Sequence, residues 1–307
     1  MAEKKRVVVY IITFTILTLL TLLFFSTCSK PSSTTTIETG APIIEFKESV
    51  RKGTPLYMGF IPQGNAVFMV KKWQPLADYL AKELQMPVET VFRSSYREII
   101  TALSKGELDL CLTGALMYVL TRDATDIRPL VRRKISGSSS YHSIIIVRKD
   151  SDLKTFNDLK GKSFAFADKE STTGYLLPIA MMRQKGINDP QTYFSKVIYA
   201  GNPDSVLLSV YTGNIDGAAI PSTRWQFENP NVKELKIIWK SEPTFLGPFS
   251  VRSGLDDGLA ARLKKAFLKI GKSPDTLELS NHIQIEGFEE AFDSDYDSIR
   301  RAAKWVF

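Results

Sequence analysis

The sequence predicts an α/β fold made of two doubly wound lobes joined by a hinge. From residue 54 to about residue 120, short apolar strands alternate with segments in which apolar residues recur at helical spacing. A second alternation of this kind covers residues 149–240. Such a rhythm is typical of parallel strands with helices on both faces of the sheet. Strand-like segments at 236–239 and 249–252 would return the chain to the first lobe.

The individual elements follow from apolar periodicity and from the glycines that end helices. In the first lobe we expect strands at 54–61, 87–92 and 108–112, and helices at 67–84, 96–105 and 114–120. In the second lobe we expect strands at 143–148, 163–167, 196–199 and 217–220, and helices at 175–184 and 203–211. The end of the chain is expected to be helical at 258–271 and 294–307. Lobe 1 is therefore assigned to residues 54–145 plus 249–307, and lobe 2 to 146–248.

Composition excludes several classes of function. The chain has 307 residues, 44% hydrophobic and 24% charged, which is ordinary for a globular protein. The net charge of +7 comes from scattered lysines and arginines, so no basic, aromatic-rich element predicts nucleic-acid binding. Only two cysteines, Cys28 and Cys111, and two histidines, His142 and His282, are present, which rules out a zinc site of the cysteine type and argues against a disulfide. We expect no metal and no cofactor.

The first 53 residues predict export and anchoring. Lys4, Lys5 and Arg6 precede the uncharged run 7–25, which has the order of charges expected of an export signal. Cys28 follows this run and opens a Ser/Thr/Pro-rich stretch, an arrangement similar to a bacterial lipobox, although Thr27 stands where Gly or Ala is usual. We expect lipidation of Cys28 and a flexible linker over 29–53. The alternative is that 7–25 stays uncleaved as a membrane anchor.

The loops after the predicted strands carry the candidate site, because ligands of open parallel sheets bind beyond the carboxyl ends of strands. The loop Ser171–Gly174 offers three hydroxyls and free N–H groups at a helix N-terminus, which favours an oxyanion. Ser171 or Thr172 could instead be a simple N-cap. Asp204 has the same two interpretations at the next helix, and Tyr141 and His142 alternate in facing, so at most one of them enters a cleft.

Enzyme motifs are absent from the sequence. It contains no GxSxG elbow, no P-loop and no GxGxxG after a strand, and two histidines leave little for a nucleophile–base pair. The Asp residues of GELDLCLTG and GNIDGAAIP fit a repeated topology in two lobes better than a pair of catalytic carboxylates. Catalysis is therefore not expected.

Seven phrases in order resemble the phosphonate/phosphite-binding branch of the type II periplasmic binding proteins of ABC transporters. They begin at Gly59 (GFIPQGN), Trp73, Ser95, Tyr141 (YHSIIIVRKD), Ser171 (STTGYLLPIAMM), Asp204 (DSVLLSVYTGNIDGAAI) and Ile237. The resemblance covers residues 54–255 and implies a binding protein that closes at its hinge on a small anion. It also implies a place outside the cytoplasm and delivery of the ligand to an importer permease.

Residue by residue, the resemblance implies a ligand site at the loop 171–174. The family's Ser-Thr-Ser-Gly loop falls on Ser171, Thr172, Thr173 and Gly174, and its Tyr before the crossover strand falls on Tyr141. Asp204 is kept, and an aromatic of the family is Thr113 here. Arg224 follows a strand end and could add a charge-assisted contact, or it could pack at the surface.

Departures from the family pattern concern the rest of the ligand. Pro203 stands where the family often has an anion-contacting His, and Thr223 and Gly247 stand where binders of aminoalkylphosphonates carry carboxylates. We therefore expect a small anion without a cationic tail, bound by a monomer. A binder of a different small molecule and a sensory ectodomain remain alternatives, and an enzyme on the same fold is the less favoured one.

Overall fold

The computed structural model describes residues 54–62, 64–226 and 230–307. All of the described residues belong to one compact unit of the chain. The predictions for the export signal, the lipidation of Cys28 and the linker lie outside the described residues. Among those residues, none of the helices combines the length and the apolar character needed to span a membrane.

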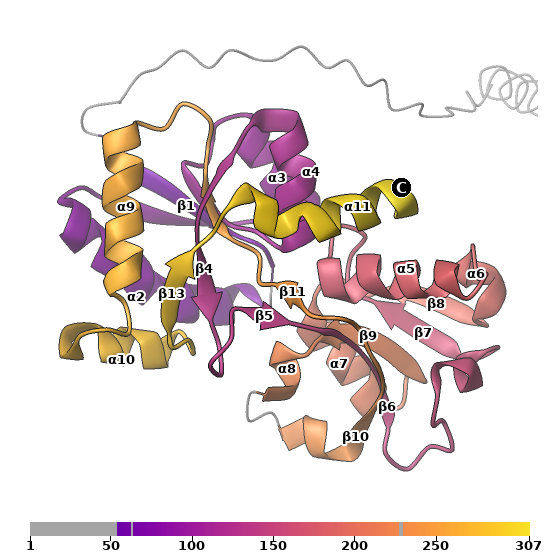
Figure 1. Cartoon of the computed structure of the whole chain (residues 1–307). Coiled ribbons are helices and arrows are strands. Elements are labelled where there is room, and N and C mark those ends of the chain that lie inside the picture. The colour runs from indigo at the N-terminus through magenta and orange to yellow at the C-terminus, as the bar shows by residue number, and fades with distance from the viewer. Residues whose placement is uncertain (1–53, 63, 227–229) are drawn as a thin grey trace, which may run out of the picture. The chain divides into compact units, whose positions relative to one another are not determined.

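The first lobe is built on a six-stranded sheet in the order β13-β4-β12-β3-β1-β2 (Figure 1). Its parallel part consists of β1 (Leu56–Phe60), β2 (Val88–Phe92) and β3 (Leu110–Leu112). The strands β12 (Phe249–Val251), β4 (Arg128–Lys134) and β13 (Gly287–Glu290) continue the sheet with antiparallel pairing. The helices of this lobe are α2 (Ala66–Leu84), α3 (Tyr96–Ser104), α4 (Ala115–Thr125), α9 (Asp257–Lys269) and α10 (Pro274–His282).

Aromatic stacking holds α2 on this sheet. Trp73 of α2 is fully buried, stacks on Phe60 with ring centroids 4.8 Å apart, and meets Phe249 edge-on at 6.1 Å. Asn65 caps α2 by accepting a hydrogen bond from the Phe68 N–H, which fixes where the helix starts. The helix therefore begins at the loop after β1, beside the carboxyl end of the sheet.

The second lobe is built on a five-stranded sheet in the order β10-β6-β9-β7-β8. Its strands are β6 (Ser143–Arg148), β7 (Ser163–Phe166), β8 (Lys196–Tyr199), β9 (Gly217–Pro221) and β10 (Leu235–Lys240). Its helices are α5 (Leu177–Gln184), α6 (Pro190–Tyr193), α7 (Pro203–Tyr211) and α8 (Thr223–Gln226), with a π-helical turn, η2 (Thr172–Leu176), ahead of α5 and 3-10 turns η1 (Phe156–Leu159) and η3 (Pro230–Glu234).

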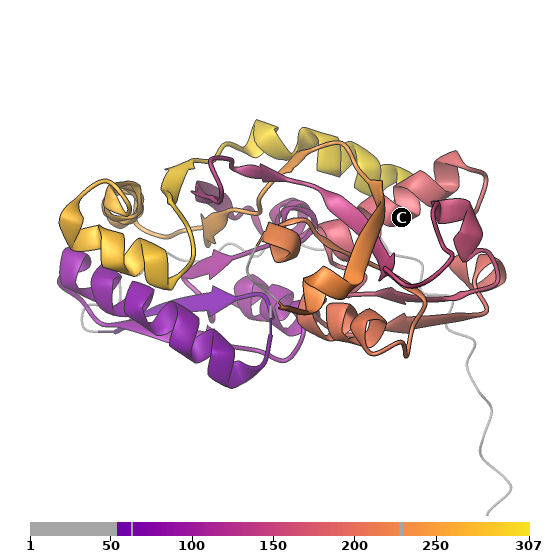
Figure 2. The same cartoon turned by 90° about the horizontal axis from the view of Figure 1, so that it is seen from below.

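Two features join the lobes. The short strands β5 (Ser140–Tyr141) and β11 (Thr244–Phe245) pair antiparallel where the chain crosses between the sheets, as Figures 1 and 2 show. After the turn η4 (Asp293–Tyr296), the last helix, α11 (Asp297–Val306), packs against both α4 and α5. As a result, one hydrophobic cluster contains residues of both lobes, among them Leu116 of α4, Ile179 of α5 and Ile299 of α11.

The expected fold class is confirmed, and two details are corrected. The strands are not all parallel, because β12, β4, β6, β10 and β13 pair antiparallel. The apolar patterns of the sequence predict neither β4 nor β13. The lobe limits of 54–145 plus 249–307 and 146–248 stay a prediction, although β6 begins at Ser143 and belongs wholly to the second sheet, which would place the first crossing a few residues earlier.

Candidate functional site

A cavity of about 70 Å³ lies between the lobes, where the carboxyl ends of β1, β3, β7 and β9 meet. A space of this size suits a small ligand of a few non-hydrogen atoms rather than a drug-sized molecule. Both lobes contribute to its walls, which are formed by Ile61, Lys72, Tyr96, Thr113, Gly114, Arg133, Ile135, Tyr141, Ser171, Thr172, Thr173, Pro203, Pro221, Thr223, Arg224, Leu246, Gly247, Ile283, Gln284 and Ile285.

The loop 171–174, which we call the Ser-Thr loop, forms one wall. Ser171 caps the π-helical turn, since its Oγ accepts a hydrogen bond from the Gly174 N–H at 3.1 Å. Thr172 Oγ1 accepts from the Leu116 N–H at 2.8 Å, and its hydroxyl also hydrogen-bonds with the Tyr141 phenol. The N–H groups of Thr172 and Thr173 form no hydrogen bond within the described part of the chain. The loop thus presents donors at a helix N-terminus, where an oxyanion is stabilised.

Two buried tyrosines stand beside this loop. Burial raises the pKa of Tyr141, while hydrogen bonding to Thr172 and Thr173 and the charge of Arg133 act in the opposite direction. Burial likewise raises the pKa of Tyr96. Both phenols are therefore neutral at physiological pH and serve as hydrogen-bond donors at the edge of the cavity.

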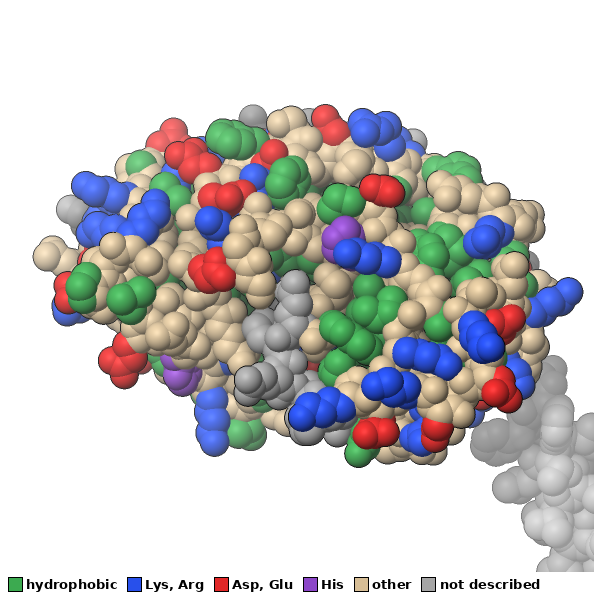
Figure 3. All heavy atoms as spheres, turned by 60° about the horizontal axis from the view of Figure 1, so that its bottom comes forward, with side chains coloured by type: hydrophobic (Ala, Val, Ile, Leu, Met, Phe, Trp, Pro, Cys, Tyr) green, Lys and Arg blue, Asp and Glu red, His purple; other side chains and the backbone are tan. Residues whose placement is uncertain are grey.

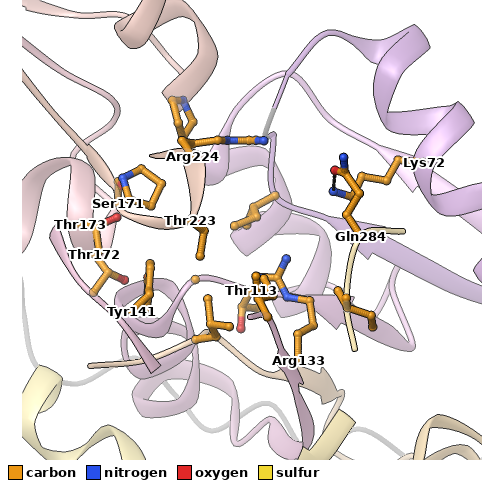
Figure 4. A pocket seen from close by; sticks show the side chains of 18 of the residues that line it. Lys72, Thr113, Arg133, Tyr141, Ser171, Thr172, Thr173, Thr223, Arg224 and Gln284 are labelled. Carbon is orange, nitrogen blue, oxygen red and sulfur yellow. Dashed lines mark hydrogen bonds between the residues drawn. The ribbon is translucent and has the colours of Figure 1, made fainter. Parts of the chain in front are cut away.

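Three cationic side chains line the same cavity. Lys72 of α2 and Arg133 of β4 come from the first lobe, and Arg224 of α8 comes from the second. Figure 4 shows Lys72 across the pocket from the Ser-Thr loop, with Arg133 and Arg224 between the two. Lys72 Nζ donates to Gln284 Oε1 at 3.2 Å and lies 5.6 Å from the centre of the Trp73 ring.

Burial is the main cause of the lowered pKa values of Lys72 and Arg133. It lowers the pKa of Lys72 to about 7, with further lowering by Arg133 and Arg224 and a partial offset by Asp204. Burial also lowers the pKa of Arg133 to about 10. Arg133 is only 9% exposed, and its Nε has no hydrogen-bond partner among the described residues. Buried positive charge of this kind is costly unless an anion compensates it.

Asp204 compensates Arg224 but does not itself line the cavity. Its Oδ1 lies 3.3 Å from Arg224 Nε, and its side chain is 43% exposed. Asn202, not Asp204, caps α7, and the ring of Pro203 at the start of that helix faces the cavity. The Asp204 carboxylate therefore pairs with Arg224 and does not compensate the charge of Arg133.

The positions that depart from the family pattern also lie at the cavity. Thr223 and Gly247 both line it, and neither supplies a negative charge. A side chain at position 247 would collide with the backbone, because a Cβ there would lie 2.1 Å from the Thr113 carbonyl oxygen. Glycine at this position lets the β11–β12 connection approach the end of β3 closely, and Thr113 N donates to the Pro248 carbonyl at 3.0 Å.

Most of the predicted ligand contacts are brought together by the fold. Thr113, Tyr141, Ser171, Thr172, Thr173 and Arg224 line the cavity, whereas Gly174 and Asp204 do not. Gly174 has a packing role instead, since a Cβ there would lie 2.6 Å from Ala167 Cβ. The His142 ring points elsewhere and bonds the Ser241 carbonyl at 2.8 Å. Ligand binding by any of these residues remains a prediction.

Sequence reasoning missed Lys72, Arg133 and Gln284. The strand that carries Arg133 reads RPLVRRK, with a proline and four charged residues among seven. It therefore lacks the alternation of apolar residues from which a strand is predicted. Lys72 sits beside Lys71 on an amphipathic helix and looks like any solvent-facing lysine until the fold buries it.

The lobes contact each other around the cavity. The hydrogen bond from Leu116 to Thr172 joins α4 to the Ser-Thr loop, and Arg97 of α3 forms an ion pair with Glu170 at 2.6 Å. The first is buried, whereas the Arg97 side chain is 80% exposed, so the ion pair contributes little energy. The buried contact is the one that holds the two walls together.

Other classes of site find little support in the described residues. No group of three or more His, Cys, Asp or Glu side chains within them could hold a metal ion, and Cys111 is a buried free thiol. Figure 3 shows positive and negative side chains mixed over one face of the molecule, without a large patch of a single sign. The concentration of positive charge is inside the cavity.

Comparison with known proteins gives a consistent result. Residues 58–296 match the family model described as "ABC transporter, phosphonate, periplasmic substrate-binding protein". The chain is 27% identical to the phosphate-import protein PhnD of Mycolicibacterium smegmatis over 67% of this chain and 69% of that protein. It is 26% identical to the phosphonates-binding periplasmic protein of Escherichia coli, over 81% and 75%.

A solved structure shares the fold. The methylphosphonate complex of PhnD1 from Prochlorococcus marinus matches with a TM-score of 0.74 and 22% identity, covering 82% of this chain and 97% of that one. At this level of identity the likeness establishes the two-lobed architecture and nothing about the ligand of this chain.

The buried cation at Lys72 generates a prediction about stability. Because the folded-state pKa of about 7 lies below the ordinary 10.5, the unfolded chain binds more protons between these values, and unfolding free energy should rise with pH in that window. Lys72→Met should raise the unfolding free energy by on the order of 3 kcal/mol below pH 7. The gain should fade as the pH approaches 10, as measured by urea unfolding in phosphate-free buffer.

The matched control is Lys71→Met, which changes the exposed neighbouring lysine on the same helix. It should leave the pH dependence of the wild type intact. Equal effects of the two substitutions, or a gain from Lys72→Met that does not vary with pH, would show that Lys72 is solvated in the folded protein.

Proposed function

Since the chain belongs to the periplasmic substrate-binding proteins of phosphonate ABC transporters, we propose that it captures a small phosphonate- or phosphite-like oxyanion in this cavity and delivers it to an importer. The family places the folded part outside the cytoplasm. The single observation that carries the choice of ligand charge is the convergence of Lys72, Arg133 and Arg224 on a cavity whose opposite wall is a helix N-terminus.

The Ser-Thr loop is proposed to hold the oxyanion. Thr172 and Thr173 offer their backbone N–H groups, and their hydroxyls add two further donors. Charge-assisted hydrogen bonds of this kind are shorter and stronger than neutral ones. Tyr141 and Tyr96 would complete the set from the crossover and from α3. Gly174 takes part only through the close packing that lets the turn form.

Closure of the lobes is proposed to couple capture to transport. A ligand held by the Ser-Thr loop and by the cations of the first lobe would bridge the two lobes and shift an open–closed equilibrium toward the closed form. The Leu116–Thr172 hydrogen bond would form only in that state. The importer would then recognise the closed form, and the ligand would leave chemically unchanged, so we propose no catalytic activity and a monomeric working unit.

Removing the Thr172 hydroxyl tests the role of the loop. Thr172→Ala deletes one donor to a charged group, an interaction of about 1.5–3 kcal/mol, and so should weaken methylphosphonate binding about ten- to a hundredfold in calorimetry. Thr172→Ser, which keeps the hydroxyl, should restore most of the affinity.

Thr212→Ala serves as the control, because the Thr212 hydroxyl bonds the Leu208 carbonyl at the exposed end of α7. It should bind as the wild type does. If Thr172→Ala binds methylphosphonate with unchanged affinity while remaining folded, the assignment of this loop is wrong.

We further propose that the protein is held at a membrane through Cys28. The apolar run 7–25 and the Ser/Thr-rich stretch after Cys28 support cleavage behind Thr27, lipidation of the thiol and a flexible tether to the folded part. Cys28→Ala should leave the precursor unprocessed or release the protein into the soluble fraction. Fractionation and intact-mass measurement check this, and a mature wild-type protein that retains residues 1–27 would contradict it.

A further inference from the structure

We infer that the preferred ligand carries two acidic groups: a phosphonate-like group at the Ser-Thr loop and a second, carboxylate-like group at Arg133 and Lys72. This inference rests on the proposed function and specifies its ligand class. In the cavity, the Ser-Thr loop with its hydroxyl and N–H donors lies at one end and Lys72 at the other, and Arg133 and Arg224 lie between them.

Arg133 supplies the strongest argument. Its side chain is nine-tenths buried, its Nε has no partner among the described residues, and it forms no ion pair there. The charged and titratable groups that act on it are Tyr141 and Tyr296, whose phenols are neutral, and the cations Arg224 and Lys72, which repel it. A guanidinium presents donors in a planar fork that matches a carboxylate in two parallel hydrogen bonds. The missing partner of Arg133 is therefore an acidic group from the ligand.

Lys72 and Gln284 extend this end of the cavity. The Lys72 ammonium is held by the Gln284 side-chain oxygen at 3.2 Å, and both residues face the cavity. Gln284 fixes the direction of the ammonium. Arg224 lies between the two ends and is partly compensated by Asp204 at 3.3 Å, so it suits the shared middle of a ligand rather than its tail.

The opposite charge on the tail is disfavoured by the same residues. An ammonium group here would face Lys72 and Arg133, and no Asp or Glu is among the described residues that line the cavity. Like charges brought together in a desolvated cavity are costly. The small volume of the cavity, about 70 Å³, also favours a short spacer between the two acidic groups.

Three ligands with the same phosphonate head test the inference: methylphosphonate, phosphonoacetate and 2-aminoethylphosphonate. Calorimetry on the full-length protein in detergent, at one pH and one salt concentration, should give at least tenfold tighter binding of phosphonoacetate than of methylphosphonate. 2-Aminoethylphosphonate should bind at least tenfold more weakly than methylphosphonate.

Arg133→Gln locates the second group. It should reduce phosphonoacetate affinity at least tenfold more than it reduces methylphosphonate affinity, so that the preference between the two largely disappears. Arg128→Gln is the matched control, because Arg128 lies on the same strand but pairs with Asp257 outside the cavity. Its ligand preference should be that of the wild type. Thermal unfolding of both variants reports whether they are folded, and Arg133→Gln should be no less stable than wild type because it removes a buried, unpaired charge.

The outcomes separate this inference from the proposed function. Equal affinities for methylphosphonate and phosphonoacetate, or an equal loss of both on Arg133→Gln, would overturn the two-acid ligand while leaving an oxyanion site in place. Tightest binding of 2-aminoethylphosphonate would also overturn it. No binding of any of the three ligands to the folded wild-type protein would overturn the proposed function and this inference together.

Discussion

Positive charge held away from water is the constraint on which the site depends. Lys72 and Arg133 lie on α2 and β4 in the body of the first lobe, and both are buried at the cavity between the lobes. In the proposed closure of the lobes, the cost of burying these charges would oppose closure of the empty protein. An anion lowers that cost, so the same residues that recognise a ligand also make closure depend on it.

The remaining contacts between the lobes are suited to a reversible motion. Among the described residues they include one buried hydrogen bond at Thr172, an exposed ion pair at Glu170, the short β5–β11 ribbon, and the packing of α11 across α4 and α5. The ribbon connects the lobes at the cavity itself, where Tyr141 of β5 and Leu246 after β11 line the wall. Such connections leave the walls free to separate while the sheets stay intact.

The architecture can be predicted from the sequence because it depends on local patterns. The cationic part of the site cannot be predicted in this way. Alternating apolar strands and helices specify the two lobes, and the Ser-Thr loop follows a strand in the sequence itself. Arg133 and Lys72 reach the cavity only through tertiary packing. Strand β4 is paired on both sides within a sheet and so needs no apolar alternation of its own to form. The place of Asp204 in the sequence predicts a ligand contact, but in the structure its carboxylate forms an ion pair with Arg224.

Gly247 also bears on how the specificity of this protein could be changed. The backbone of residues 113 and 114 occupies the space that any side chain at 247 would need, because a Cβ there would lie only 2.1 and 2.6 Å from their atoms. A carboxylate cannot be installed there by a single substitution without first moving the β11–β12 connection. A route from this protein to a receptor for amines would therefore have to begin at Thr223, or to lengthen the loop before β12, and the mutational path between the two specificities is indirect.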